Sequence, residues 1–177
     1  MKEKNALIIG IKNSESICTE IAKSLKKTGY EIYATYQNEN VYESVYQMGE
    51  EIGIKEIFPY DARNDDDLKK LGLSFSEKNI QLDVLVHGIA YSSDEKAKLN
   101  QYLLSVEWEA FTDAIRIGAF SLVELVSALY PVLKDSSSIL ALTSRWSHIA
   151  VPGFNVVACA KAALNSIIRG LAESLGK

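Results

Sequence analysis

The chain is 177 residues long, with 47% hydrophobic and 24% charged residues and a formal net charge of −4. These values are typical of one soluble globular domain. The acidic balance argues against nucleic acid and anionic membrane surfaces as partners, because both attract basic proteins.

Strand and helix patterns alternate along the first half of the chain. Short apolar or alternating runs predict strands at residues 6–10, 31–36, 54–60 and 82–87. Between them, apolar residues spaced by threes and fours predict helices at residues 17–28 and 41–52. A third helix is expected to open with the acidic stretch 61–67, because helix N-termini favour negative charge.

The second half continues the pattern with longer helices. After a polar loop at residues 91–100, a helix is predicted over residues 106–129, where Pro131 stops it. The apolar run 139–142 predicts the fifth strand, and a last helix is predicted over residues 155–175. Lys161 therefore lies near the start of the last helix, within two turns of the carboxyl end of the strand.

Repeated strand–helix units favour a parallel sheet, because each helix crosses over between two strands. The predicted fold class is α/β, a Rossmann-type doubly wound parallel sheet with strand order 3-2-1-4-5. We expect a single dinucleotide-binding domain over residues 1–177. Ligands of such sheets bind at the carboxyl ends of the strands.

The turn after the first strand carries one glycine, Gly10, and lacks the G-x-G-x-x-G fingerprint. It still leads into a helix N-terminus, which suits a pyrophosphate. Ser16 is expected either to bind phosphate or to cap that helix. Between Ala34 and Lys55 there is no arginine or lysine to hold a 2′-phosphate, so NAD(H) is favoured over NADP(H).

The remaining reactive side chains suggest structural roles. Cys18 and Cys159 are expected to be reduced thiols. His87 is interpreted as structural or close to the cofactor, and His148 as a loop residue rather than a general base. The acidic residues 65–67 are interpreted as a helix start, and no spacing predicts a metal site. With neither a signal peptide nor an apolar run of about 18 residues, we expect a cytoplasmic protein that does not enter the membrane.

Several short motifs match a known family over nearly the whole chain. They are Gly10-Ile-Lys-Asn-Ser-Glu-Ser16-Ile17, Thr35-Tyr-Gln37, Tyr60-Asp61-Ala62, Leu85-Val-His-Gly88-Ile89-Ala90, Ser121-Leu-Val and Lys161-Ala-Ala-Leu. By these residues the chain resembles the short-chain dehydrogenase/reductase superfamily. Within it, the chain resembles the enoyl-acyl-carrier-protein reductases of bacterial fatty-acid synthesis, whose first turn also carries one glycine.

The resemblance implies a set of cofactor-binding residues. It assigns Gly10, Ser16 and Ile17 to the diphosphate, Gln37 to the adenosine ribose, Asp61 and Ala62 to the adenine, Gly88, Ile89, Ala90 and Ile117 to the cofactor cleft, and Thr143 to the nicotinamide side. It assigns Lys161 to the nicotinamide ribose. The family has a serine at the position of Gly88.

The same resemblance places the catalytic residues and shows a departure. Phe154 stands where the family has the tyrosine that contacts the thioester carbonyl, and Ser144 stands at a second tyrosine position. Ser144 and Lys161 also fit the serine and lysine of the wider superfamily, whose tyrosine position is Val157 here. Both patterns therefore lack the phenol. Trp146 replaces a small residue and is expected to fill part of the substrate space.

The chain ends directly after the predicted last helix, whereas the family continues with two strands and a substrate loop. We therefore expect a truncated reductase domain. The first hypothesis is NADH-dependent reduction of an enoyl thioester, with low activity, on an acyl thioester or acyl carrier protein. The alternatives are a non-catalytic relative that acts as a nucleotide-binding or assembly partner, and a ketoacyl-type reductase. The helices over 106–129 and 156–175 are expected to form a homo-oligomer, as in the superfamily.

Overall fold

The structure, a computed structural model, describes residues 3–91 and 103–176. Residue contacts divide the chain into two compact units. The first comprises Met1–Gly88 and Val126–Leu140, and the second comprises Ile89–Leu125 and Ala141–Lys177. The predicted loop at residues 91–100 lies almost entirely outside the described residues.

The elements follow the predicted alternation of strands and helices. The strands are β1 (Lys4–Ile9), β2 (Tyr30–Tyr36), β3 (Glu56–Pro59), β4 (Leu82–His87) and β5 (Leu133–Ala141). The α-helices are α1 (Ile17–Lys27), α2 (Glu39–Ile52), α3 (Asp65–Glu77), α4 (Trp108–Ile115), α5 (Ser121–Leu129) and α6 (Asn155–Leu175). Short helical turns are η1 (Leu103–Ser105), η2 (Arg116–Phe120), η3 (Tyr130–Val132) and η4 (Arg145–Ser147).

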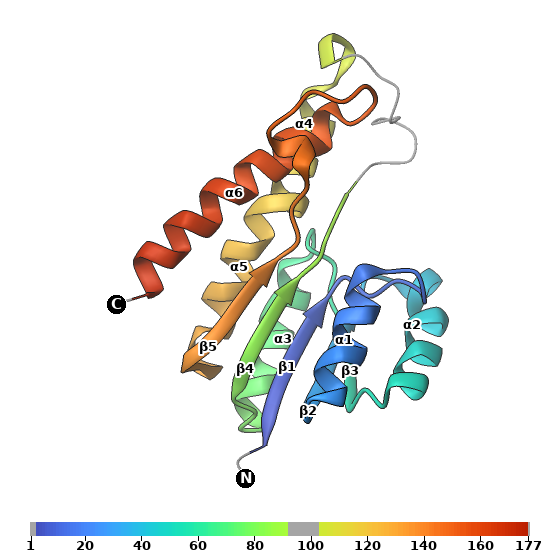
Figure 1. Cartoon of the computed structure of the whole chain (residues 1–177), viewed down its shortest axis with the longest axis vertical. Helices are drawn as coiled ribbons and strands as arrows, with labels where there is room; N and C mark the ends of the chain where they lie inside the picture. Colours follow the sequence, from blue (N-terminus) through green and yellow to red (C-terminus); the bar gives the residue numbers. More distant parts are fainter. Residues whose placement is uncertain (1–2, 92–102, 177) are drawn as a thin grey trace. The chain divides into compact units, whose positions relative to one another are not determined.

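The five strands form one sheet in the order β3-β2-β1-β4-β5, which confirms the prediction (Figure 1). The central strand β1 pairs in parallel with two neighbours, so that Ala6 lies opposite both Ile32 and Val84. The order of strands reverses beside β1, since β2 lies on one side and β4 on the other. A doubly wound sheet binds its ligand at such a reversal point.

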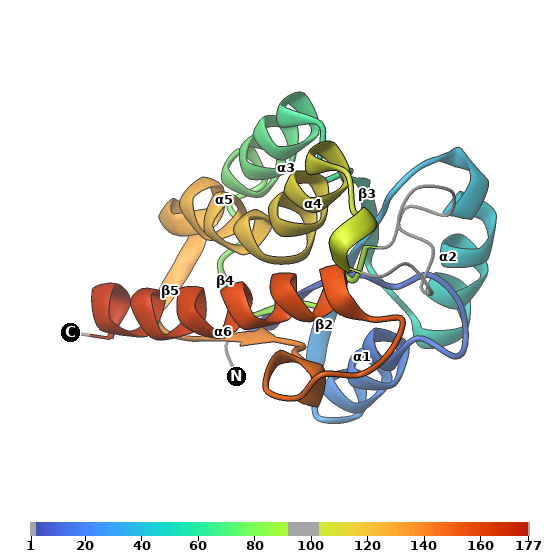
Figure 2. The same ribbon diagram turned by 90° about the horizontal axis from the view of Figure 1, so that it is seen from above.

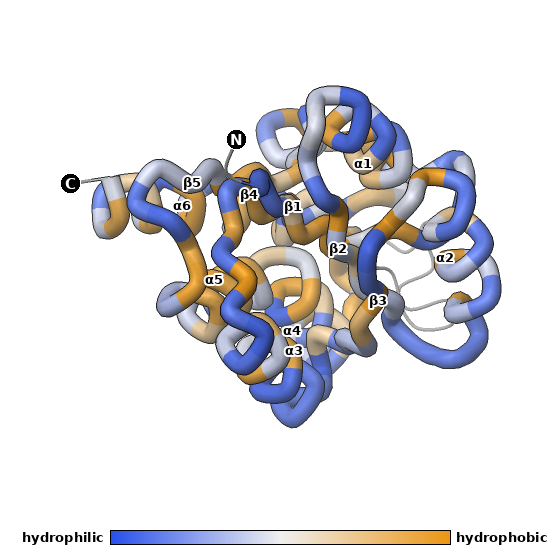
Figure 3. Tube along the Cα trace, turned by 90° about the horizontal axis from the view of Figure 1, so that it is seen from below, coloured by the Kyte–Doolittle hydropathy of each residue, from blue (hydrophilic) through white to orange (hydrophobic). Residues whose placement is uncertain are grey.

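The core of the first unit forms because its central strands are apolar on both faces. Residues Ala6 to Ile9 of β1 are at most 1% exposed. In Figure 3 the tubes of β1 and β4 are largely orange. Tyr33 of β2 packs edge-on against Phe75 of α3 at 5.3 Å between ring centroids. Figure 2 shows α1 and α3 on opposite sides of the strands.

Strand β5 is longer than the apolar run 139–142 predicted, because its polar first half lies at the edge of the sheet. Edge strands tolerate polar side chains on an exposed row of backbone groups. The ammonium of Lys134 in β5 lies 2.7 Å from the carboxylate of Asp83 in β4. The backbone N–H of Asn5 donates to the same carboxylate. The ion pair joins β5 to β4 where the apolar signal is weak, and the Asn5 contact joins β1 to the same residue of β4.

The long helix predicted over 106–129 forms as the continuous helical stretch Trp108–Val132, which contains a π-helical turn, η2, between α4 and α5. The Ser121 hydroxyl donates to the carbonyl of Ile117 at 2.6 Å. A Cβ on Gly118 would lie 3.1 Å from Cβ of Ala160, so glycine permits close packing of η2 on α6. Such π-turns occur often at functional sites, and this one contains a predicted cofactor residue.

One helical stretch among the described residues, Trp108–Val132, has the length and hydropathy that a membrane-spanning helix requires. The sequence expectation that no stretch reaches this threshold is therefore wrong. Half of its most apolar window is buried within the structure. A core helix of a soluble protein meets the same criterion, so the stretch is weak support for a membrane span.

Candidate functional site

The carboxyl ends of β1 and β4 meet in a close contact between two glycines. The N–H of Gly88 donates to the carbonyl of Ile9 at 2.8 Å. Gly10 has φ +109°, and a Cβ there would lie 2.7 Å from the carbonyl oxygen of Gly88. The predicted residues Gly10 and Gly88 are thus neighbours, and the first turn requires glycine for both conformation and space.

We expect Gly10→Ala to lower the free energy of unfolding by about 2–3 kcal/mol, because strain at positive φ adds to a backbone clash. Gly29→Ala is the matched control. Gly29 also has positive φ, +89°, but its Cβ would meet nothing within 4 Å. Urea unfolding should therefore show a loss of only about 1 kcal/mol for the control. Equal losses in the two variants would contradict the close contact.

Ser16 organises the turn between β1 and α1. Its hydroxyl accepts the N–H groups of Lys12 at 3.1 Å and Asn13 at 3.2 Å. Ser16 occupies the N-cap position of α1, but its side chain makes no capping hydrogen bond. The capping interpretation is therefore wrong, and the hydroxyl instead holds the loop in shape. Ile17, the first residue of α1, is 68% exposed.

Gln37 and Asp61 come together at the carboxyl ends of β2 and β3. The amide of Gln37 donates to the Asp61 carboxylate at 3.5 Å. Arg63 binds that carboxylate through Nε at 3.1 Å and Nη2 at 2.6 Å. Burial works to raise the pKa of Asp61, but the hydrogen bonds and charge of Arg63 outweigh it and lower that pKa. Ala62 is half-buried in the same turn.

Lys161 is a charged residue whose side chain is buried within the second unit. It is 5% exposed and is therefore buried, unlike a lysine on the solvent face of an amphipathic helix. Its ammonium donates to the carbonyl of Ile89 at 2.9 Å and to that of Leu142 at 2.8 Å. Ile89 and Leu142 follow β4 and β5 in the chain. A buried ammonium needs such acceptors, because leaving it without partners is costly.

Phe154 and Trp146 form a stacked aromatic pair, with ring centroids 3.7 Å apart. Phe154 directly precedes α6, and Trp146 lies in η4. The Ser144 hydroxyl accepts the N–H of Trp146 at 3.2 Å and so caps that short turn. Ser144, Trp146 and Phe154, the residues that the resemblance places near the substrate, thus lie together in the loop between β5 and α6.

Asn165 of α6 contacts this loop, and the sequence analysis did not single it out. Its amide donates to the Ser147 hydroxyl at 2.8 Å, and that hydroxyl donates to the carbonyl of Ser144 at 2.6 Å. The same amide lies 3.3 Å from Nε2 of His148. Asn165 follows Lys161 by one helical turn, and this spacing on one helix face is the sequence signal that could have identified it.

The other predicted cofactor residues are distributed along the second unit. Ile117 is buried within η2, whereas Thr143 and Ala90 are exposed. No group of histidine, cysteine and acidic side chains suited to a metal ion occurs in the described part of the chain. Asn64 caps α3, and its acidic first turn follows, as predicted for a helix start. Both cysteines are free thiols.

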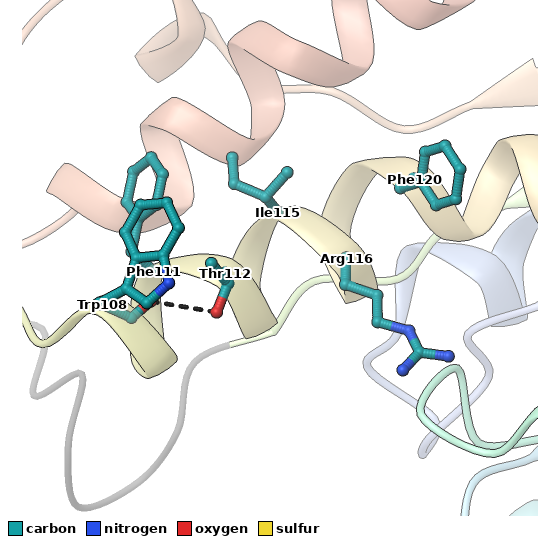
Figure 4. Close-up of a pocket in the computed structure, with 6 residues that line it drawn as sticks. All are labelled: Trp108, Phe111, Thr112, Ile115, Arg116 and Phe120. Carbon is teal, nitrogen blue, oxygen red and sulfur yellow. Dashed lines mark hydrogen bonds between the residues drawn. The ribbon is translucent and has the colours of Figure 1, made fainter.

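A shallow pocket runs along α4 and η2 of the second unit (Figure 4). It is lined by Trp108, Phe111, Thr112, Ile115, Arg116 and Phe120. Trp108 is 71% exposed and Phe120 is 49% exposed. Exposed rings gathered on one helix face are typical of an interaction surface.

Three features define a Rossmann-type domain of the short-chain dehydrogenase/reductase class. They are the strand order, the single-glycine turn after β1 and the buried lysine on the helix that follows β5. A sequence model of the family described as Enoyl-(Acyl carrier protein) reductase matches residues 10–177. The chain therefore belongs to the enoyl-(acyl carrier protein) reductase family.

Relatives in this family carry the name Enoyl-[acyl-carrier-protein] reductase [NADH] FabI. The one from Buchnera aphidicola subsp. Baizongia pistaciae is 32% identical over 176 residues, covering 99% of this chain and 67% of the relative. The one from Neisseria meningitidis serogroup B is 34% identical over 178 residues, covering 100% of this chain and 68% of the relative.

Solved structures agree with this assignment. The NADH enoyl-[acyl-carrier-protein] reductase of Aquifex aeolicus superposes with a TM-score of 0.92 and 32% identity, covering 98% of this chain and 68% of that one. The reductase of Anaplasma phagocytophilum in complex with NAD superposes with a TM-score of 0.91 and 29% identity, covering 98% and 66%. The chain thus spans about two thirds of the length of its relatives.

Proposed function

We propose that this chain binds NAD(H) and takes part in the NADH-dependent reduction of an enoyl thioester in fatty-acid biosynthesis. The observation that carries the proposal is the buried ammonium of Lys161, held on the carbonyls of Ile89 and Leu142. A lysine on this helix is the group that the resemblance assigns to the nicotinamide ribose. The relatives' names add support, since they are NADH enzymes.

The residues of the first unit fit a dinucleotide. Gly10 has φ +109°, so the chain can turn sharply after β1, and a glycine turn of this kind lets a phosphate approach the backbone. The N-terminus of α1 has no side-chain cap from Ser16, and its N–H groups suit an anion. We assign Gly10, Ser16 and Ile17 to the diphosphate in this proposal. Gln37, Asp61 and Ala62 are assigned to the adenosine.

We assign residues of the second unit to the nicotinamide and the substrate. These residues are Ile89, Ala90, Ile117, Thr143, Ser144, Phe154 and Lys161. When bound, NADH supplies the hydride. The chain must then stabilise the negative charge that develops on the thioester oxygen. Phe154 has no hydroxyl to do so. The Ser144 hydroxyl accepts one hydrogen bond from Trp146 and retains its own proton, so we assign it the remaining donor role.

The lost phenol predicts slow chemistry, because removal of one oxyanion donor costs about 10²- to 10³-fold in rate. A second function is therefore proposed as the alternative: a non-catalytic relative that binds nucleotide or assists assembly. The stacked rings of Phe154 and Trp146 favour it, since they replace a polar group by an apolar pair.

Three further assignments belong to this proposal. The continuous family match over residues 10–177 supports one dinucleotide-binding domain. The exposed rings of α4 and η2 support a homo-oligomer, with a second copy of this chain on that face. By the relatives' names, an acyl carrier protein is the expected substrate carrier, and we place the protein in the cytoplasm.

NADH at about 100 times its Kd should raise the Tm of the chain by about 5–10 °C, because binding to the native state adds about 2.7 kcal/mol. Thermal unfolding with and without NADH measures this shift. Loss of NADH absorbance on adding a crotonyl thioester then measures turnover. A shift without turnover favours the non-catalytic alternative. No shift with NADH would contradict cofactor binding, and with it both the reductase and the nucleotide-binding functions.

A further inference from the structure

A cation lies beside the residues assigned to the adenosine, although the sequence has no arginine or lysine between Ala34 and Lys55. It is Arg63, which belongs to the loop after β3. Its guanidinium binds the Asp61 carboxylate, and Gln37 contacts the same carboxylate oxygen as Nη2 of Arg63. Folding therefore brings an arginine to the residue assigned to the adenosine ribose. Arginine is also the residue that accommodates the 2′-phosphate of NADP(H).

Asp61 holds this arginine through three donors. The backbone N–H of Arg63 donates to Oδ1 at 2.9 Å, Nε donates to Oδ1 at 3.1 Å, and Nη2 donates to Oδ2 at 2.6 Å. A fork of this kind uses an N–H edge of the guanidinium that a phosphate would also use. The Asp61 side chain is 17% exposed and that of Arg63 is 47% exposed. The arginine could therefore reach a ligand if the carboxylate released it.

A second carboxylate lies beside the pair. The backbone N–H of Asp61 donates to Asp67 at 3.1 Å. Tyr36 lies near by, and its pKa is raised first by burial and then by the charges of Glu39 and Asp67. Asp67 thus lies beside the Asp61–Arg63 pair, and these two carboxylates outweigh the single positive charge of Arg63. A 2′-phosphate would meet repulsion there.

We propose that Asp61 determines the choice between NAD(H) and NADP(H) by neutralising Arg63. This rests on the proposed function, since it concerns the cofactor of the same site. In the native chain the carboxylate occupies the guanidinium fork and repels a 2′-phosphate. Without the carboxylate, Arg63 becomes the counter-ion for that phosphate. Asp61 is thus a specificity residue in addition to the adenine contact that the resemblance implies.

The test measures the Kd of the full 177-residue chain for NADH and for NADPH by their fluorescence. Asp61→Asn keeps an oxygen that can accept the N–H of Arg63 but removes the charge. Its ratio of NADPH Kd to NADH Kd should fall at least tenfold. Arg63→Gln leaves Asp61 without this counter-ion, so its ratio should rise. The double variant Asp61→Asn, Arg63→Gln should lose the gain in NADPH affinity.

Asp66→Asn is the matched control, because it removes one charge from the same turn on a side chain that is 76% exposed. Its ratio should stay at the native value. An Asp61→Asn variant that weakens both dinucleotides equally would overturn the inference and leave only the adenine role. The same ratio in the single and double variants would also overturn it, because Arg63 would then be uninvolved. If the native chain binds neither dinucleotide, the proposed function itself fails.

Discussion

Phe154→Tyr is expected to raise the rate of enoyl-thioester reduction by about 10²- to 10³-fold. The substitution adds one hydroxyl to a ring that is already in place, since Phe154 stacks on Trp146 at 3.7 Å. That hydroxyl would donate to the thioester oxygen as charge develops on it, in the role that the family resemblance gives to tyrosine. NADH consumption with a crotonyl thioester measures the change in kcat.

Two controls separate this effect from a change in packing. Phe154→Leu removes the ring without adding a donor, so its rate should not exceed that of the native chain. Phe154→Tyr combined with Lys161→Met should show no gain, because the cofactor would not be held. A Phe154→Tyr chain that binds NADH normally yet turns over no faster would contradict the assigned role of residue 154. The non-catalytic alternative would then be the better explanation.

Lys161→Met should lower the free energy of unfolding by about 2–3 kcal/mol and abolish the thermal shift with NADH. The carbonyls of Ile89 and Leu142 would lose their ammonium donor, and a buried polar group left without a partner costs about 1–3 kcal/mol. Removal of a buried charge offsets part of this cost. Methionine preserves the apolar stem of the side chain, so the loss reports mainly on the ammonium.

Urea unfolding measures the stability of this variant, and NADH titration measures its binding. Lys23→Met is the control, because Lys23 pairs with Glu20 at 2.7 Å on the surface, and such pairs contribute little. It should leave both readouts nearly unchanged. Equal stability of the two variants would show that the Lys161 ammonium does not hold the second unit together. A retained NADH shift in Lys161→Met would remove its assignment to the ribose.

The strands at the centre of the sheet were the most predictable part of the fold. The bounds of β4 agree with the prediction at both ends, because its apolar run stops at Gln81 and at Gly88. The bounds of α6 agree for a similar reason, since its apolar spacing is continuous from Asn155 to Leu175. A helix or strand whose buried residues recur at a regular spacing can be predicted from a single sequence.

Elements at the edge and at interruptions were less predictable. The polar first half of β5 has no apolar signal, because its pairing depends on contacts with β4, such as that of Lys134 with Asp83. The π-turn η2 does not change the apolar composition of its helix, so periodicity predicted the long helix but not the turn within it.

The sequence by itself determined the fold class, the order of the strands and the presence of Lys161 on the last helix. These features follow from the spacing of apolar residues within each short segment, which a single sequence shows directly. The tertiary structure decided the partners of the polar groups. It brought Arg63 to Asp61 and Gln37, placed Asn165 on the loop of Ser144, and directed Ser16 to its own turn instead of α1. Hydrogen bonds and ion pairs depend on distances between atoms, and several groups within reach compete for each donor. Those distances exist only once the strands and helices have packed.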